Sequence, residues 1–365
     1  MGRNAWYNLP EEVVEMVFAY LPISEVFKLR LVCKQWKSIL TSKSFMELWT
    51  NLSPPNPWFL VYHSSDVLSA YDPCYSTWTN MPVYERCVLD SRQVLLMASA
   101  GGLLCFRNRN AEYPTLIVCN PLTKTHKVLP EMLHIRYIDI VGMVADKTTN
   151  SYKILVTGTS ESSTDESITE VYDSRLGRWI YHCNSKQEFL QFWYEVHAIW
   201  LEGFFYCLAM PVTAAQGYRL LRYNMEARKW DDLDVKMPSH DIRCPSLLIC
   251  RGRLLLAAKI VEDYSIRSIC IWELKMDCLQ WVRIDVMPGE VLSKIHLPYF
   301  LILQCQGNNN LICFSTHRGW QSLLYDLSDR SWRWLPENRA DARFRAIGRN
   351  NLVGMPYEPS LAATV

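Results

Sequence analysis

The chain has 365 residues, of which 49% are hydrophobic and 21% are charged, with 38 Lys and Arg against 37 Asp and Glu. This balance excludes a disordered chain, which combines low hydrophobicity with high net charge. The formal charge of +1 removes the general electrostatic basis for direct binding to nucleic acid or to an anionic membrane. No apolar run reaches the roughly 18 residues of a membrane-spanning helix. From the charge and the lack of such a run, we expect neither a nucleic acid nor a membrane partner.

The residues that carry chemistry form no recognisable site. The 13 cysteines form an odd set without a C-x-x-C pair, and the eight histidines lack metal-binding spacing. No phosphate-binding loop, nucleophile elbow or dinucleotide fingerprint occurs. The segment from Met1 to Trp6 lacks the apolar core of a signal peptide. We therefore expect buried thiols in a reducing compartment, the cytoplasm or the nucleus, with no metal, no cofactor and no catalytic residue.

The first fifty residues predict three short helices. Asn8 followed by Glu11 is typical of a capping box, with Pro10 in the first turn. Apolar residues then recur at helical spacing up to Pro22, and again after Ser24, the predicted cap of the second helix. They are Val13, Met16, Val17, Tyr20 and Leu21 in the first stripe, and Val26, Leu29, Val32, Cys33 and Trp36 in the second. A third short element begins at Ser44.

Three small helices cannot bury all of these apolar side chains by themselves. From the residues alone, two interpretations stay open: a docking surface for a partner protein, or a helical cap packed on the rest of the chain. Pro54, Pro55 and Pro57 then favour an extended spacer. We place a helical domain at residues 1–52, a linker at 53–57, a second domain at 58–355 and a tail at 356–365.

A repeat fills the second domain. Tyr-x6-Trp, with Asp or Asn after each Tyr, occurs four times, although fewer than one pair is expected by chance from 14 Trp and 19 Tyr. The pairs are Tyr71/Trp78, Tyr172/Trp179, Tyr223/Trp230 and Tyr325/Trp332. Two weaker copies, from Cys119 to Pro130 and from Ile271 through Glu273 to Trp281, complete a set of six. The later tryptophans recur every 51 residues, close to the period of kelch blades.

Short β-rich runs precede each copy, and four strands in each period predict an all-β, kelch-type β-propeller of six blades. The Tyr closes a strand, the Asp or Asn side chain begins a tight turn, and the Trp packs on a neighbouring blade. The first unit lacks an innermost strand, and the segment from Phe344 to Ile347 remains unassigned. We therefore expect the C-terminal strand to close the ring by completing the first blade.

The connections that cross from one blade to the next must emerge on one face of such a ring, and their aromatic and arginine residues are typical of binding hot spots. The alternative for each residue is a plug at a blade junction. A second choice of binding surface is the acidic loop predicted from Ser160 to Ser167. The predicted target-binding residues are Arg136, Tyr137, Phe192, Trp193, Tyr194, Asp241, Arg243 and His296.

Two resemblances narrow these interpretations. The string Leu9-Pro10-Glu11-Glu12-Val13, the pair Leu21-Pro22, the string from Leu29 to Trp36 and Phe45 resemble an F-box, the module by which ubiquitin-ligase adaptors dock on Skp. The second domain resembles plant F-box/kelch-repeat proteins, including the F-box only branch, in its segments 98–106 (ASAGGLLCF) and 120–124 (NPLTK). The resemblance implies Skp contact at Leu9, Pro10, Val13, Leu21, Pro22, Val26, Leu29, Val32, Cys33 and Trp36, or a place in the F-box core for some of them, Trp36 above all.

The resulting expectation is a small three-helix F-box followed by a six-bladed propeller, acting as the substrate-recognition subunit of a Skp-cullin-F-box ubiquitin ligase. Its partners are a Skp-family adaptor, through it the cullin and RING subunits, and an unidentified protein target. Its contribution is proximity, because the chemistry belongs to other subunits. One alternative is an interaction scaffold or transcriptional cofactor outside the ligase. A propeller enzyme is disfavoured because the expected inner strands are apolar apart from Asp139, His197 and Gln304.

Overall fold

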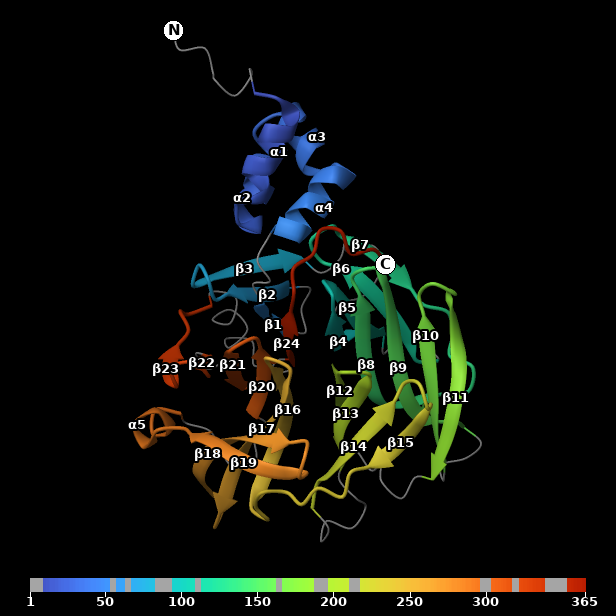
Figure 1. Cartoon of the computed structure of the whole chain (residues 1–365), viewed down its shortest axis with the longest axis vertical. Helices are drawn as coiled ribbons and strands as arrows, with labels where there is room; N and C mark the ends of the chain where they lie inside the picture. The colour runs from blue at the N-terminus through green and yellow to red at the C-terminus, as the bar shows by residue number, and fades with distance from the viewer. Residues whose placement is uncertain are drawn as a thin grey trace.

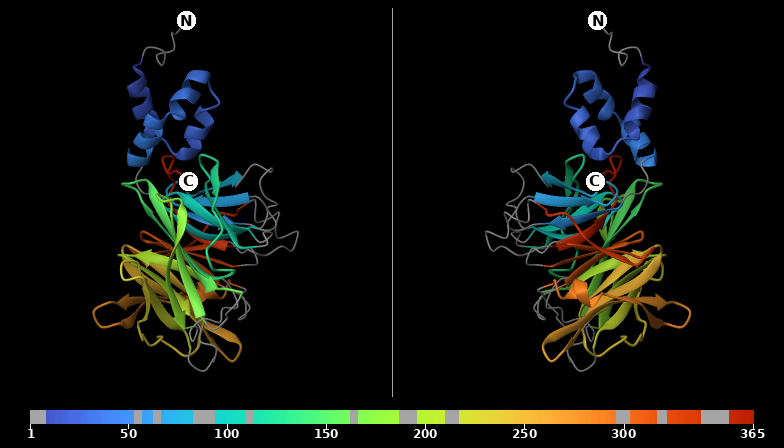
Figure 2. Two further views of the ribbon diagram at one scale, coloured as in Figure 1. Left: turned by 90° about the vertical axis from the view of Figure 1, so that its right-hand side faces the viewer. Right: turned by 90° about the vertical axis from the view of Figure 1, so that its left-hand side faces the viewer.

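The structure is a computed structural model in which a helical end stands on a larger body of β-sheets (Figure 1). The residues that it describes are 9–52, 57–62, 67–82, 94–108, 113–161, 166–186, 196–209, 217–295, 303–316, 322–338 and 353–365. Side views show the helices at one edge of the sheet body, with the C-terminus at the junction between the two parts (Figure 2).

The helical end contains four helices, α1 (Glu11–Ala19), α2 (Ile23–Leu29), α3 (Lys34–Leu40) and α4 (Lys43–Leu52). The predicted second helix, continuous to Trp36, is therefore wrong. Cys33 has extended backbone geometry, with φ of −155°, and its Sγ accepts a hydrogen bond from the Trp36 amide at 3.4 Å. A side chain that accepts from the third residue onward begins a new helix, so the chain turns between α2 and α3.

The caps of α1 and α2 also differ from the sequence expectation. Pro10 and Pro22 precede the first helical residues, and each carbonyl accepts the first amide hydrogen bonds of its helix. The predicted cap at Ser24 is wrong, since Ser24 lies inside α2. Asn8, the other half of the predicted capping box, lies outside the described residues. Leu-Pro therefore begins both helices through the fixed φ of proline rather than through a polar cap.

The strands form antiparallel four-stranded units. The first sheet has the order β24 (Val353–Tyr357), β1 (Trp58–Tyr62), β2 (Val67–Asp72) and β3 (Thr77–Pro82). The next has β4 (Val94–Ala100), β5 (Leu103–Asn108), β6 (Thr115–Asn120) and β7 (Thr125–Val128). Two later sheets are β16 (Ile242–Cys250), β17 (Arg253–Glu262), β18 (Ser265–Lys275) and β19 (Gln280–Val286), and β20 (Leu303–Asn308), β21 (Leu311–Thr316), β22 (Leu323–Asp326) and β23 (Ser331–Trp334).

Two further units are joined into one eight-stranded sheet, because β8 pairs in parallel with β12. Its order is β11 (Arg178–Lys186), β10 (Glu166–Asp173), β9 (Ser151–Thr159), β8 (Tyr137–Asp146), β12 (Val196–Leu201), β13 (Phe204–Ala209), β14 (Arg219–Asn224) and β15 (Lys229–Asp232). A short helix, α5 (Gly289–Leu292), follows β19. The inner strands β24, β4, β8, β12, β16 and β20 each contact the next one, which gives the sheets a propeller-like arrangement (Figure 1).

The repeated Tyr and Trp residues are cross-strand partners, which confirms the predicted repeat. All four Tyr-x6-Trp pairs stand opposite each other between the third and fourth strands of their unit. Their ring centroids lie 4.5 to 5.5 Å apart. This is the spacing of attractive edge and tilted aromatic contacts, so each pair stabilises the hairpin of the third and fourth strands.

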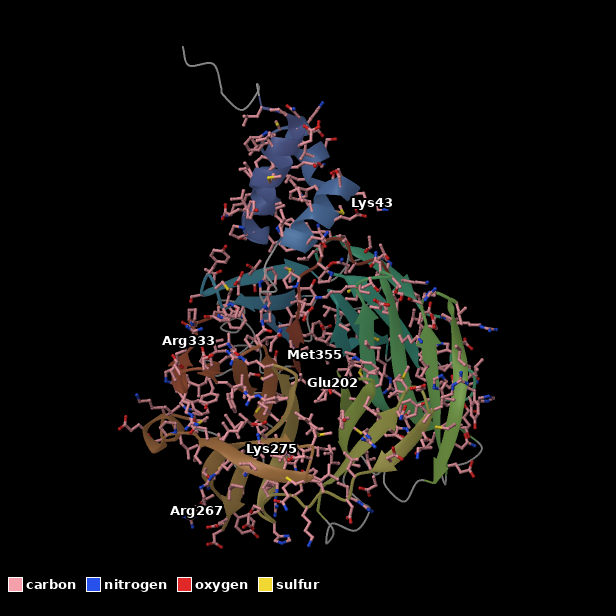
Figure 3. The ribbon with its side chains drawn as sticks, in the orientation of Figure 1. Lys43, Glu202, Arg267, Lys275, Arg333 and Met355 are labelled. Carbon is pink, nitrogen blue, oxygen red and sulfur yellow. The ribbon has the colours of Figure 1, made fainter. Side chains whose placement is uncertain are left out.

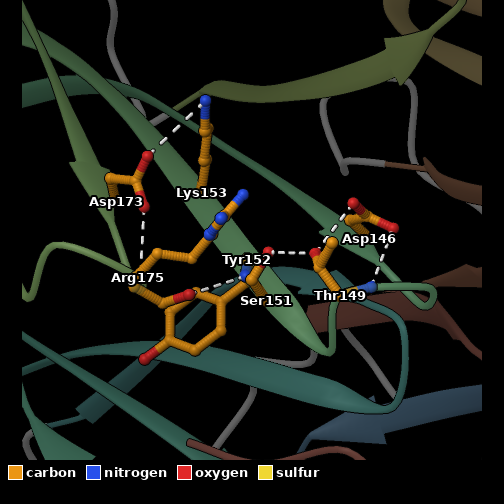
Figure 4. Close-up of polar contacts among 8 residues, drawn as sticks. Asp146, Thr149, Ser151, Tyr152, Lys153, Asp173 and Arg175 are labelled. Carbon is orange, nitrogen blue, oxygen red and sulfur yellow. Dashed lines mark hydrogen bonds and ion pairs between the residues drawn. The ribbon is translucent and has the colours of Figure 1, made fainter.

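The predicted turns are also confirmed. In each Tyr-Asp or Tyr-Asn copy, the side-chain oxygen accepts the backbone amide two residues later, as Asp173 does from Arg175 at 2.9 Å (Figure 4). The same bond occurs at Asp72, Asn120, Asn224 and Asp326. Each turn ends on a residue with left-handed backbone geometry, namely Ser76, Lys124, Gly177, Arg228, Leu279 and Arg330.

The fifth copy has a different register from the one expected. Trp281 stands opposite Leu274, and Lys275 begins the turn. Leu274-Lys275 therefore occupies the Tyr-Asp place, and the assignment to Ile271 through Glu273 is wrong. The apolar Leu274 retains the packing role, whereas Lys275 has no side-chain oxygen for the turn. Without a polar signal, the sequence alone could not fix this register.

The C-terminal segment closes the first sheet and then packs against the helices. β24 pairs antiparallel with β1, so a C-terminal strand completes this sheet as expected, although it lies at Val353–Tyr357. The segment from Phe344 to Ile347 lies outside the described residues. Leu361, beyond β24, is 2% exposed and belongs to the same apolar core as Phe18 and Trp49 of the helices. The predicted tail at 356–365 is therefore part of the packed structure.

Candidate protein-binding surfaces

One face of the helical end exposes apolar side chains. Val14 and Phe18 of α1, which lie outside the predicted stripe, turn into the core. Within that stripe Val13, Met16, Val17 and Tyr20 are exposed, and Leu21 is half-buried against the core. Val32 is 60% exposed and Leu31 is 87% exposed, both in the turn between α2 and α3. The apolar helix face consists of Leu9, Val13, Met16, Val17, Tyr20, Leu31 and Val32. Several large apolar side chains exposed on one helix and in a nearby turn are typical of a protein-binding site.

The residues expected to contact Skp fall into two groups. Leu9, Pro10, Val13 and Val32 are exposed, whereas Leu21, Leu29 and Trp36 are half-buried and pack against the core. Pro22 and Cys33 are half-buried beside the helix ends that they cap. Val26 is fully buried, so we remove it from the proposed contact surface.

Trp36 has a structural role as well. Its ring meets Phe18 edge to face, with centroids 4.9 Å apart. Leu31 is absent from the expected Skp contacts, and a helix break after Leu29 is the signal that would have revealed its exposure. The period of 3.6 residues continues across that break, so the pattern of apolar residues hides it.

The crossover that leads from β7 to β8 is a rigid surface element. Glu170 of β10 is fully buried, and its carboxylate accepts the amide N–H groups of Leu133 at 2.8 Å, His134 at 2.6 Å and Ile135 at 3.3 Å. Because a carboxylate that accepts several amide bonds holds them strongly, Glu170 fixes the backbone of this crossover. Nothing in the sequence pattern singled out Glu170.

Arg136 and Arg243 have equivalent roles in two crossovers. Arg136 Nη1 donates to the carbonyls of Met132 at 3.2 Å and Ile135 at 3.0 Å. Arg243 Nη1 donates to those of His240 at 3.3 Å and Ile242 at 2.8 Å. In both loops the preceding isoleucine is buried. These arginines therefore hold the crossover backbone, a role that the prediction of direct target contact did not include.

The remaining predicted target-binding residues divide by position. Tyr137 is 60% exposed at the start of β8. Asp241 is half-buried, and its carbonyl accepts the Val261 amide, so it also supports its loop. The structure thus presents Tyr137 to solvent and uses Asp241 internally. The others, Phe192, Trp193, Tyr194 and His296, lie outside the described residues.

Polar groups on the inner strands are mostly engaged in internal contacts. His197 of β12 lies 2.6 Å from the Met97 carbonyl of β4, measured from its Nδ1. Gln304 accepts the Gly354 amide at 2.8 Å. Burial raises the pKa of Asp139 to about 6, against the opposing attraction of Arg107. Within the described part of the chain, no three His, Cys, Asp or Glu side chains gather as metal ligands do.

A hollow of about 1150 Å³ lies where the helices meet the sheets, and the C-terminal segment forms part of its lining. The buried Asn120 amide donates to the carbonyls of Ser360 and Ala363, both at 2.9 Å. Gly102 has a φ of +89°, and a Cβ at this position would approach Ser360 Cβ to 2.5 Å. The segment therefore fits closely on the turns that face the helical end. Lys43 at this end and Arg267 lie at opposite ends of the molecule (Figure 3).

Comparison with known proteins supports this geometry. Residues 6–51 match the F-box domain, and residues 47–334 match the F-box associated beta propeller domain. The chain belongs to the F-box proteins with this propeller domain. The apolar helix face thus lies within the F-box, and the crossovers lie within the propeller domain.

Related proteins come from plants. The chain is 28% identical to F-box only protein 6 of Arabidopsis thaliana, over 92% of this chain and 70% of that protein. It is 30% identical to Protein ABERRANT PANICLE ORGANIZATION 1 of Oryza sativa subsp. indica, over 99% and 90%. It is 23% identical to Protein UNUSUAL FLORAL ORGANS of Arabidopsis thaliana, over 92% and 80%.

One solved structure shares the fold alone: TolB from Acinetobacter baumannii has a TM-score of 0.51 at 10% identity, over 88% of this chain and 72% of that one. Among the described helices, none combines the length and apolar character needed to cross a bilayer.

Proposed function

We propose that this F-box protein is the substrate-recognition subunit of a Skp-cullin-F-box ubiquitin ligase, in the cytoplasm or the nucleus. The observation that carries the proposal is the apolar helix face, which is exposed within a matched F-box. A Skp-family adaptor covers this face and links the chain to the cullin and RING subunits. The propeller binds a protein target, and the chain catalyses no reaction itself, because proximity to the ubiquitin-loaded enzyme is sufficient.

For the receptor we propose a ring of six four-stranded blades, closed in the first blade by β24. The pairing of β24 with β1 and the contacts of β24 with β20 and β4 support closure. The left-handed residue that ends each third-to-fourth strand turn supports the number of blades. Closure by β24 covers the edge of β1 and leaves the connecting loops free to vary.

The proposed Skp contacts are the exposed residues of the apolar helix face together with Pro10 and Pro22. Leu21, Leu29, Cys33 and Trp36 support this surface from the core side. The decisive variants are Val32→Asp and Leu31→Asp, because both side chains are exposed and their loss leaves the helical core intact. We expect a loss of about 2–4 kcal/mol in binding to a purified Skp-family adaptor, as for a buried hot spot.

Leu176→Asp is the matched control, since Leu176 is 56% exposed in a turn of the propeller domain. Calorimetric titration should give wild-type affinity for this control. Undiminished adaptor binding by both F-box variants would contradict the proposal. Adaptor binding without cullin recruitment in a reconstituted mixture would instead favour an interaction scaffold outside the ligase.

A further inference from the structure

Exposed apolar residues of the propeller domain gather where β7, β8 and β11 reach the crossover face. Tyr137 is 60% exposed, and Val128 is 52% exposed. We define the crossover patch as Val128, Leu133, His134, Tyr137 and Tyr181, all of which are exposed. It joins the outer strand of one blade to the inner and outer strands of the next.

Several contacts hold the patch in one piece. Tyr181 stands opposite Glu170 in the β10–β11 ladder, so the two side chains lie on the same face of the sheet. Glu170 binds the amides of Leu133 and His134, and the His134 ring meets Tyr181 edge to face at 5.9 Å. The patch is therefore preorganised, and binding to it costs little loop ordering.

Hydrogen bonds also connect the neighbouring blade to the crossover patch. Trp179 Nε1 donates to the Pro130 carbonyl at 2.8 Å, which anchors the end of the blade that carries Val128. The Arg136 amide donates to the Thr159 carbonyl at 2.8 Å, beside Tyr137. These bonds fix both edges of the patch, so its apolar side chains stay exposed in a defined arrangement.

Acidic side chains lie near the edge of the patch, and Lys186 is the cross-strand partner of one of them, Glu166. Glu131, Glu161 and Glu166 are exposed near its edge, and none forms an ion pair with a described residue. Glu166 is linked to the patch through Asn184, whose amide nitrogen donates to Glu166 and whose oxygen accepts the Tyr181 hydroxyl at 3.0 Å.

Two of the nearby cations contact aromatic rings. Arg136 lies 4.9 Å from the Tyr113 ring centroid, and Lys127 lies 5.9 Å from that of Tyr172. Both cations are thus directed at the protein itself, whereas the carboxylates face solvent. The apolar crossover patch, with carboxylates near its edge, complements a positively charged partner that also carries apolar groups.

We propose that the crossover patch binds a cationic peptide segment of the target that carries apolar or aromatic side chains. This inference rests on the proposed function and deepens it by naming the chemical class of the target segment. The apolar side chains of the segment cover Leu133, Tyr137 and Tyr181, and its lysines or arginines face Glu131, Glu161 and Glu166. Burying the aromatic side chains supplies affinity, and the carboxylates select the charge.

The test is a selection from a displayed library of random twelve-residue peptides on the purified full chain, with adaptor binding measured separately. We expect the enriched peptides to combine Lys or Arg with Leu, Phe, Trp or Tyr. Binding of a selected peptide should weaken about tenfold in Leu133→Ser/Tyr137→Ser, and about tenfold in the triple variant Glu131→Gln/Glu161→Gln/Glu166→Gln.

Leu176→Ser/Tyr75→Ser is the matched control, since both side chains are about as exposed as those of the patch but lie in turns away from it. This control should bind the selected peptide at wild-type affinity. Enrichment of acidic peptides, absence of enrichment, or equal binding by the patch variants would overturn the inference. If the patch binds cationic peptides but the chain fails to bind the adaptor, the proposed function is contradicted, whereas the inference about the crossover patch is supported.

Discussion

The repeat tryptophans occupy equivalent positions but bind different groups through their indole N–H. Trp179 donates to the Pro130 carbonyl, and Trp230 donates to Thr169 Oγ1 at 3.0 Å. Trp78 likewise donates to the Pro336 carbonyl at 2.8 Å. Each of these bonds reaches an adjacent blade. Trp281 differs, because its Nε1 is buried without a hydrogen-bond partner among the described residues.

Replacing these tryptophans by phenylalanine should separate packing from hydrogen bonding. Trp179→Phe and Trp230→Phe lose ring volume and an indole hydrogen bond. Trp281→Phe loses ring volume but also removes a buried N–H that has no described hydrogen-bond partner. We expect the first two to lose about 1 kcal/mol more in free energy of unfolding than the third. Urea unfolding of the three variants measures this difference, and equal losses would contradict the assigned bonds.

Asp139 gives the fold a defined pH dependence. Its pKa is about 6 in the folded chain because burial penalises the carboxylate, and the ordinary value is 3.8. The folded state therefore holds this proton more tightly than the unfolded state, so the contribution of Asp139 to stability falls as pH rises from about 4 to about 6. Above that window the carboxylate is charged in both states and its cost is constant.

Asp139→Asn should therefore equal the wild type in stability below about pH 4 and exceed it by about 1–3 kcal/mol above pH 7. Thermal or urea unfolding across pH 4 to 8 measures the gap. One carboxylate oxygen of Asp139 is buried without a described hydrogen-bond partner, and the amide of the variant carries no charge at this position. A stability gap that stays flat across this range would contradict the assignment of the raised pKa.

At the scale of elements, the C-terminal segment connects the F-box to the blades. Asn150 binds it twice, through the Ala362 carbonyl at 3.0 Å and the Thr364 amide at 3.3 Å. Thr50 of α4 accepts the Ala362 amide at 3.4 Å, so the same segment touches the F-box and the propeller. It fixes where the apolar helix face points relative to the crossovers.

Removal of residues 358–365 should destabilise the chain by at least about 3 kcal/mol, because it uncovers the core around Leu361 and leaves the buried Asn120 amide unpaired. The free energy of unfolding in urea measures the loss. Thr364→Ala is the control, since its side chain is exposed and only its backbone bonds to Asn150. Wild-type stability of the truncated chain would rule out a packed tail.

At the scale of the whole molecule, the N- and C-terminal parts of the propeller domain depend on each other through one strand. β24 lies between β1 and the inner strands β20 and β4. Truncation after Asn338 removes β24 and exposes the edge of β1, whereas truncation after Tyr357 keeps β24 paired with β1.

We expect the first truncation to abolish the cooperative unfolding transition and the second to retain it at lower stability, because loss of β24 unpairs β1 and removes the contacts with β20 and β4. Near-ultraviolet circular dichroism during thermal unfolding distinguishes the two. A sharp transition in the chain that ends at Asn338 would contradict closure by β24.

The sequence determined the domain order, the repeat and the turn chemistry, because each depends on local spacing. Leu-Pro before each of the first two helices, Tyr-x6-Trp and the following Asp or Asn act within seven or eight residues, so they can be read without a fold. The register of the fifth copy was not readable, because Leu274 and Lys275 lack the polar signal that marks the turn elsewhere.

Only the tertiary structure decided which apolar side chains are covered and which loops are rigid. Val13 and Val14 look alike in sequence, yet Val14 is 4% exposed and Val13 is 42% exposed. Glu170, His134 and Tyr181 meet although they come from separate segments. The C-terminal segment binds Asn120 and Asn150, more than 200 positions earlier in the chain. Burial and hydrogen bonding depend on contacts between remote segments, and local periodicity carries no information about those contacts.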